Sequence, residues 1–223
     1  MLHAKIEGKP SAIAPASQPP EDPIRLYRLK TVLSGDQGVG KSSLILQFVE
    51  NAFQDTTPVR FEGRYMARTI EVGRKLAKLE LVDTVCEEIF RHLSDYFYDL
   101  TKGIMLVYDV TNKESFNNIR FWFKDMEKYY ERHKEPHPPI LLVGNKCDLV
   151  SERVVDFNAG ASLAQELGIP FIETSSKDHL SVDATFALLS EPMIQELSQI
   201  RNRFYYTTPE REALPVKKSC TLQ

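Results

Sequence analysis

The chain has 223 residues, enough for one α/β domain with tails but few for two complete domains. Hydrophobic residues make up 42% and charged residues 26%, as in ordinary globular proteins, and the net charge of -3 excludes a general attraction to nucleic acid. No apolar run reaches the roughly 20 residues of a membrane span, and the N-terminus lacks the apolar stretch of a secretory signal. Three widely spaced cysteines suggest neither a zinc site nor a disulfide framework, which favours a reducing cytosol.

Residues 1–23 are rich in Ala, Pro and Ser and have no periodic apolar pattern, so we expect a disordered arm there. A folded domain is expected over 24–203, followed by a tail without pattern over 204–223. Its expected strands start near Leu26 and cover the segments up to 33, then 64–72, 75–83, 103–109, 140–145 and 170–174. The expected helices cover 42–51, 116–132, 157–167 and 182–204. Alternating strands and helices predict a doubly wound α/β sheet that binds ligands at the carboxyl ends of its strands.

A glycine-rich segment follows the first expected strand. Residues 35–42 read GDQGVGKS, which fits the phosphate-binding pattern G-x-x-x-x-G-K-[ST] between a strand and a helix. The glycines let successive backbone N–H groups face the phosphates, a lysine reaches the β- and γ-phosphates, and a serine hydroxyl binds Mg²⁺. The residues expected at this cradle are Gly35, Gly38, Val39, Gly40, Lys41, Ser42 and Ser43. The motif alone does not separate GTP from ATP.

Two further motifs end expected strands. Residues 145–148 read NKCD and resemble the N-K-x-D motif of Ras-superfamily GTPases, and residues 174–177 read TSSK and resemble that family's T-S-A-K element. In the family the Asp carboxylate accepts two hydrogen bonds from guanine, and adenine would leave it unpaired. The resemblance implies that the base is bound by Asn145, Lys146, Asp148, Ser175, Ser176 and Lys177. A nucleotide kinase is disfavoured, because it would give these motifs no role.

Residues 108–118 (YDVTNKESFNN) look like the YDVT–ESF–N pattern of the Rab branch, and the resemblance covers about residues 25–190. It implies a single P-loop domain with a six-stranded, mostly parallel sheet that binds GTP or GDP with Mg²⁺. Phe53 matches the aromatic residue that packs edgewise on the base, and Asp83 matches the carboxylate that holds Mg²⁺ through a water. The longer connection at Tyr129–Pro139 is interpreted as a surface loop, with a partner site as the alternative.

The first switch segment departs from the family pattern. An ungapped alignment places Arg60 where the family keeps a threonine that binds Mg²⁺ through its side chain and meets the γ-phosphate through its N–H. Thr56 and Thr57 lie three or four residues earlier, and a slipped loop is the alternative that would recruit one of them.

The second switch segment departs as well, since the family's DTAGQE is DTVCEE at residues 83–88. Cys86 replaces a glycine, and Glu87 replaces the glutamine that orients the attacking water. A carboxylate repels the γ-phosphate and lacks the amide donor. We therefore hypothesise slow hydrolysis, with Lys41 retained as a catalytic residue and Glu87 as a weak substitute. The alternative is that other residues compensate and hydrolysis is ordinary.

The chain ends Cys-Thr-Leu-Gln, which has the C-a-a-X form of a prenylation signal at Cys220, after Lys217 and Lys218. One prenyl chain and two lysines give reversible membrane binding; an unmodified cysteine is the alternative. The favoured function is a cytoplasmic, reversibly membrane-associated, monomeric Rab-like regulator of vesicle traffic or signalling. Its switch surface would bind effector and exchange-factor proteins. The rival is a pseudo-GTPase that acts as a nucleotide-independent interaction module.

Overall fold

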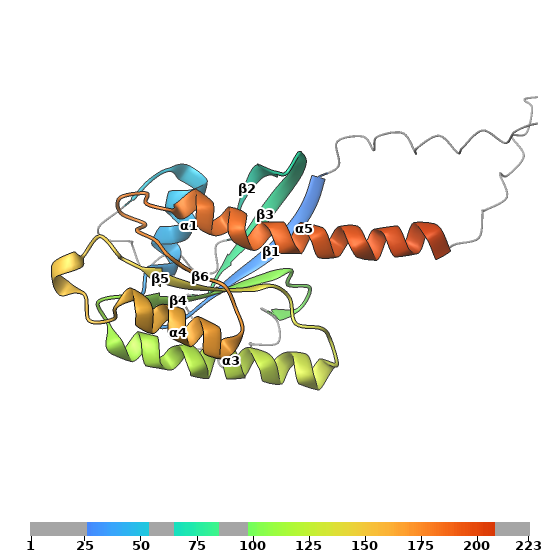
Figure 1. Cartoon of the computed structure of the whole chain (residues 1–223). Helices are drawn as coiled ribbons and strands as arrows, with labels where there is room; N and C mark the ends of the chain where they lie inside the picture. The colour runs from blue at the N-terminus through green and yellow to red at the C-terminus, as the bar shows by residue number, and fades with distance from the viewer. Residues whose placement is uncertain (1–25, 54–64, 85–97, 208–223) are drawn as a thin grey trace, which may run out of the picture.

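The computed structural model describes residues 26–53, 65–84 and 98–207, with side chains up to residue 200. Six strands form one sheet in the order β2-β3-β1-β4-β5-β6, and only the β2–β3 pair is antiparallel (Figure 1). The expected α/β fold is therefore confirmed. The strands are β1 (Leu26–Ser34), β2 (Tyr65–Val72), β3 (Lys75–Asp83), β4 (Gly103–Asp109), β5 (Ile140–Asn145) and β6 (Phe171–Glu173). The helices are α1 (Lys41–Glu50), α3 (Lys113–His133), the 3-10 turn η2 (Val150–Glu152), α4 (Phe157–Leu167) and α5 (Val182–Thr207).

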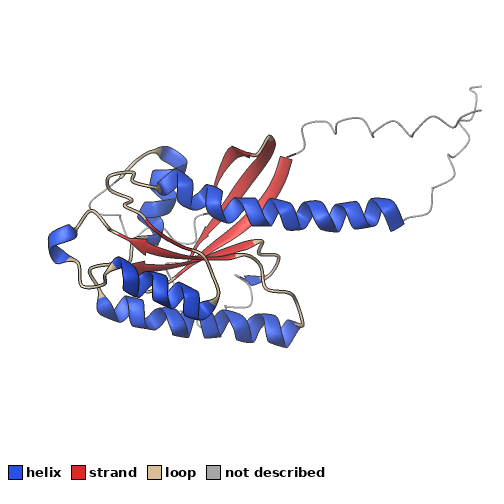
Figure 2. Cartoon of the chain, viewed as in Figure 1, coloured by secondary structure: helices blue, strands red, loops and turns tan. Residues whose placement is uncertain are grey.

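Helices cover both faces of the sheet, as Figure 2 shows. Every residue of β4 and β5 is buried, because both strands lie between neighbours and beneath helices. One core cluster joins the sheet to α1 and α5, where the rings of Phe48 and Phe186 stack with centroids 3.8 Å apart. The other joins the sheet to α3 and α4 through residues such as Ile119 and Leu163. These two layers hold the carboxyl edge of the sheet in a fixed position.

Helix α3 begins earlier than its apolar pattern indicates, and its end agrees with the expected bound at 132 to within one residue. It begins at Lys113, because the Asn112 side chain accepts hydrogen bonds from the N–H groups of Glu114 and Ser115. It continues to His133, so the interpretation of Tyr129–Pro139 as one surface loop was wrong. Tyr129 is 4% exposed and packs in the core, and only the residues after His133 form the connection.

Helix α5 runs without interruption through Pro192, although a proline inside a helix ordinarily kinks or breaks it. Leu189 and Met193, on either side of this proline, are both buried in the core cluster beneath the helix. Tertiary packing therefore outweighs the local cost of the missing N–H. None of the helices in the described ranges has both the length and the hydropathy needed to cross a bilayer.

Candidate functional site

The motifs identified in the sequence gather at the carboxyl edge of the parallel strands. The glycine-rich loop leaves β1, and Asp83 closes β3 directly beside it, since Leu33 and Asp83 are paired in register. Asp109 of β4 pairs with Asn145 of β5, and Gly144 pairs with Glu173 of β6. Segments more than a hundred residues apart in sequence therefore meet at one edge (Figure 1).

Two glycines of the loop stand where no side chain fits. Gly35 has φ +146°, and a Cβ there would collide with the carbonyl oxygen of Val107. Gly40 has φ +95°, and its Cβ would collide with the Asn145 side-chain amide. Both therefore combine a backbone conformation that L-residues rarely adopt with a close approach to a neighbour. The loop is shaped by the strands behind it into the cradle that the motif predicts.

The first residues of α1 make the cradle cationic. Lys41 is only 5% exposed, and its Nζ donates to the carbonyl oxygens of Gly35 at 2.5 Å and Asp36 at 2.9 Å. The first turn, which includes the half-buried Ser42 and Ser43, carries no acidic residue, and no side chain of the described residues caps it. The positive charge of Lys41 and the positive end of the α1 dipole therefore both lie at the glycine-rich loop. This arrangement favours the binding of phosphate groups there.

Asn145 connects the cradle to the base-reading segments. Its side chain is 0% exposed, and Nδ2 donates to the carbonyl oxygen of Val39 at 2.9 Å. Its Oδ1 accepts from the N–H of Ser176 at 3.3 Å. Both ends of the amide therefore bind protein atoms, so the buried side chain links three loops. The sequence motif named Asn145 as a site residue without specifying this linking role.

The carboxylate of Asp148 is held by Ser175. The Ser175 hydroxyl, which is fully buried, donates to Asp148 Oδ1 at 2.6 Å and accepts from the N–H of Asp178 at 3.0 Å. Because its only proton goes to the carboxylate, this serine fixes the orientation of Asp148. Lys177, next in the motif, is exposed.

Lys146 crosses from the base-reading loop to the cradle. Its Nζ donates to the carbonyl oxygen of Gly38 at 2.8 Å and lies 2.6 Å from Asp109 Oδ2. Asp109 is 6% exposed, and its other oxygen accepts from Thr111. The aliphatic part of Lys146 is thereby positioned along the edge of the site. Asp109 is a support that the sequence analysis missed, and only its place at the end of a buried strand signals it.

A second support missed by the sequence lies outside the motifs. The guanidinium of Arg153 binds both carboxylate oxygens of Glu173, at 2.7 and 2.9 Å, and this hydrogen bonding raises the pKa of Arg153. The pair joins the segment after NKCD to the strand before TSSK. Burial raises the pKa of the nearby Cys147 thiol, with a further contribution from the charge of Glu173. This cysteine is therefore a neutral thiol at physiological pH.

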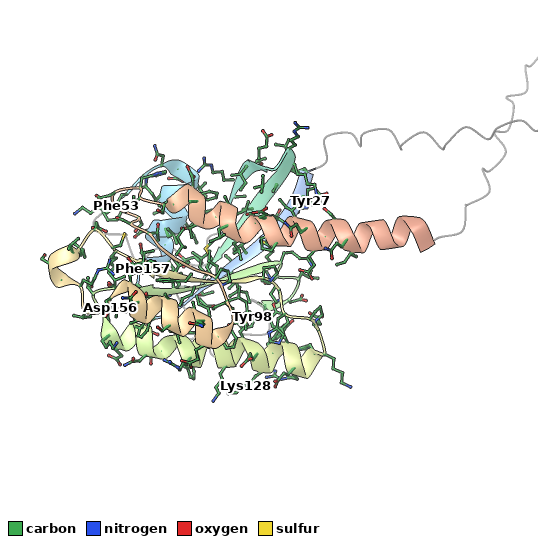
Figure 3. All side chains as sticks on the ribbon, in the orientation of Figure 1. Tyr27, Phe53, Tyr98, Lys128, Asp156 and Phe157 are labelled. Atoms are coloured by element: carbon green, nitrogen blue, oxygen red, sulfur yellow. The ribbon has the colours of Figure 1, made fainter. Side chains whose placement is uncertain are left out.

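Two other predicted positions, Asp83 and Phe53, lie within the described residues. Asp83 is 4% exposed, and the hydroxyl of the following Thr84 donates to the carbonyl oxygen of Leu33 at 2.7 Å. Phe53 is half-buried just after α1, and Figure 3 shows it at the same end of the molecule as Asp156 and Phe157. The remaining predicted positions lie outside the described residues: Thr56, Thr57, Arg60, Cys86, Glu87 and Cys220.

These residues fit a guanine nucleotide with Mg²⁺. Gly35 and Gly40 leave no room for side chains, the buried Lys41 donates to the carbonyl oxygen of Gly35, and the Ser175 hydroxyl orients the Asp148 carboxylate, which could accept hydrogen bonds from guanine. Ser42 and Asp83 are oxygen ligands of the kind that Mg²⁺ accepts alongside phosphates and water.

Comparison with known proteins agrees with this geometry. The sequence profile described as "Ras family" matches residues 30–195, so the chain belongs to the Ras family of small GTPases. It is Rab-like within that family. It is 40% identical to the Ras-related protein RIC1 of rice over 79% of this chain and 82% of that protein. It is 39% identical to the GTP-binding protein ypt2 of Schizosaccharomyces pombe (80% and 87%) and 36% identical to the Ras-related protein Rab-1D of Dictyostelium discoideum (86% and 89%).

Proposed function

We propose that the protein binds GTP and GDP with Mg²⁺ and regulates vesicle traffic as a membrane-associated Rab-like protein. The observation that carries nucleotide binding is the Asn145 amide, which joins the phosphate cradle at Val39 to the base-reading segment at Ser176. An amide that hydrogen-bonds to both elements fixes their relative position, as the binding of one ligand to both would require. The role in traffic is supported by the likeness to Rab-1D and ypt2.

Within this proposal, the γ-phosphate and Mg²⁺ are held by Lys41, Ser42 and Asp83, and guanine is selected by Asp148. We propose further that hydrolysis is slow, because Cys86 and Glu87 replace the glycine and glutamine of the family motif. Loss of the threonine contact at Arg60 and of the glycine contact at Cys86 also reduces the difference in free energy between the GTP- and GDP-bound states. Effector and exchange-factor proteins would bind the switch surface, and a prenyl group on Cys220 would attach the monomer to membranes.

The nucleotide content of the purified protein tests this proposal. The protein is denatured, and the released nucleotides are separated by chromatography. Stoichiometric GTP is the expected result, since binding is retained and turnover is slow. Mostly GDP would mean that hydrolysis is ordinary despite Arg60, Cys86 and Glu87. No nucleotide, and no uptake on addition of GTP with Mg²⁺, would favour the rival pseudo-GTPase.

The cause of slow hydrolysis is tested by Glu87→Gln in single-turnover assays on GTP-loaded protein. We expect the rate to rise by roughly 10-fold, which corresponds to about 1.4 kcal/mol of the barrier. Glu88→Gln removes a charge at the neighbouring position and serves as the matched control, with no change expected. An equal rise in both variants would assign the effect to net charge and contradict the role of Glu87.

A further inference from the structure

The phosphate cradle is tied to helix α3 by a carboxylate that the motif leaves unspecified. Asp36, the second residue of the glycine-rich loop, accepts a hydrogen bond at Oδ2 from Asn118 Nδ2 at 2.8 Å. Its Oδ1 accepts one from the indole N–H of Trp122, also at 2.8 Å. Asn118 and Trp122 are four residues apart, so they lie on the same face of α3 one turn from each other. Both carboxylate oxygens are therefore directed at one helix.

The two donors come from a firmly packed element. Ile119 and Met126 of the same helix are 0% exposed in the core beneath it, and Phe116 is 6% exposed. Helix α3 therefore cannot shift without disturbing the core. Asp36 itself is half-buried, which leaves its hydrogen bonds less screened than those of an exposed pair.

The anchored residue also carries a contact inside the cradle. The carbonyl oxygen of Asp36 accepts from Lys41 Nζ at 2.9 Å, beside the Gly35 carbonyl at 2.5 Å. Gly35 is confined from behind by the Val107 carbonyl. The peptide that faces the lysine is thus fixed on one side by β4 and on the other by α3. A displacement of α3 would therefore be transmitted to Lys41 through the side chain of Asp36.

We infer that Asp36 is a positioning residue for nucleotide binding, which holds the phosphate cradle in its binding conformation through Asn118 and Trp122. The inference rests on the proposed binding of guanine nucleotides and adds a residue and an element to it. Because linkage is reciprocal, bound nucleotide must in turn stabilise the hydrogen bond to the indole. Trp122 is the only tryptophan of the chain, so tryptophan fluorescence reports on the surroundings of this one indole, which include its hydrogen bond to Asp36.

The test compares GDP dissociation from three variants of the full-length protein, loaded with radiolabelled GDP and Mg²⁺ and chased with unlabelled GDP. Asp36→Ala removes the acceptor, and Asn118→Ala with Trp122→Phe removes both donors while keeping a ring at 122. Each should accelerate dissociation by roughly 10-fold, because hydrogen bonds to a carboxylate are among the stronger ones. Combining all three substitutions should add little, because the same contacts are removed. Asp125→Asn, a carboxylate lost elsewhere on α3, is the control and should leave the rate unchanged.

A spectroscopic readout separates positioning from general stability. Removing GDP with EDTA should change the emission of Trp122 in the wild-type protein and in Asp125→Asn, and should leave it constant in Asp36→Ala. If Asp36→Ala keeps the circular dichroism of the wild type and releases GDP at the wild-type rate, the inference about Asp36 is overturned and the proposed function is not. A wild-type protein that takes up no GDP would overturn the proposed function and this inference with it.

Discussion

The guanidinium of Arg153 donates two hydrogen bonds to the carboxylate of Glu173, and this pair joins the segment after one guanine-reading motif to the strand before the other. Arg153 follows the NKCD segment, and Glu173 immediately precedes TSSK. Their side chains are 22% and 14% exposed, so solvent screens the pair only in part. The relative position of the two guanine-reading segments therefore depends on an ion pair that touches neither motif.

Breaking this pair should weaken both the fold and nucleotide binding. We expect Glu173→Gln or Arg153→Ala to lower the free energy of unfolding by about 1–2 kcal/mol, because a partly buried charge loses its partner. GDP should bind several-fold more weakly. Urea unfolding and GDP titration measure the two effects. The exposed bidentate pair Arg120–Glu166, between α3 and α4, is the control: because solvent screens it, its loss should lower stability less than loss of the Arg153–Glu173 pair and leave GDP affinity unchanged.

Substitution of Gly35 by alanine should abolish stable nucleotide binding. The new Cβ would meet the Val107 carbonyl oxygen, and the loop must move away from the strand to avoid it. Gly168→Ala is a matched control, because Gly168 also has positive φ, +68°, but nothing surrounds its Cβ position. The control should lose only about 1 kcal/mol of stability and retain GDP binding. Equal GDP affinities in the two variants would contradict the collision argument.

Asp148→Asn should shift preference from guanine to xanthine nucleotides, since the amide reverses one donor–acceptor relation with the base. Ser175→Ala keeps the carboxylate but removes the hydroxyl that orients it at 2.6 Å. We expect this second variant to bind GDP about 10-fold more weakly without any gain for xanthosine diphosphate, a loss of about 1.4 kcal/mol. Competition binding with both diphosphates measures the preference, and an unchanged preference in Asp148→Asn would refute the assignment of Asp148.

Cys147 should react slowly with alkylating reagents at pH 8. Burial raises the pKa of its thiol, so the thiolate fraction there is smaller than that of an ordinary cysteine. The rate should rise as pH increases, because the reactive thiolate becomes more populated. Mass spectrometry of a Cys86→Ser, Cys220→Ser protein follows this site without interference. Glutathione in the same mixture gives the reference rate, and a faster reaction at Cys147 would contradict the stated environment.

Membrane attachment should depend on Cys220. Wild-type protein produced in eukaryotic cells should distribute between the membrane and soluble fractions, since one prenyl chain with two lysines binds reversibly. Cys220→Ser should move to the soluble fraction, whereas Cys147→Ser, which leaves the C-terminal motif intact, should distribute as the wild type does. Intact-mass measurement would identify the isoprenoid, and an unmodified wild-type chain would refute the prenylation proposal.

Much of the fold follows from local sequence patterns. The bounds of β3, β4, β5 and α4 agree with those expected from the sequence. Strands β4 and β5 are short apolar runs, β3 alternates between apolar and polar residues, and α4 lies between the caps Asp156 and Gly168. The start of α3 was missed, because Asn112 caps the helix before its first apolar residue. Its expected end at 132 agrees with His133 to within one residue, and the buried Tyr129 and Tyr130 belong to the helix and not to the connection after it.

The motifs of the site are predictable for the same reason: each is contiguous and follows a strand. Their supports are not, because Asp109, Arg153 and Trp122 act across distances in sequence that only the sheet order brings together. Pro192 shows the limit of a local rule, since the core contacts of Leu189 and Met193 keep α5 continuous across it.

Helix α5 extends from the carboxyl edge of the sheet to the amino ends of its strands. It starts beside the base-reading segment, and its later turns reach Ser198, which is hydrogen-bonded to Tyr27 of β1 and Lys75 of β3 at the amino ends of those strands. Its 26 residues span about 39 Å at the helical rise. The last described residue, Thr207 at the end of α5, therefore lies at the opposite end of the molecule from the carboxyl edge of the sheet (Figure 1). Under the proposed attachment through Cys220, the membrane would lie on the side of the amino ends of the strands and would leave the carboxyl edge accessible to partners.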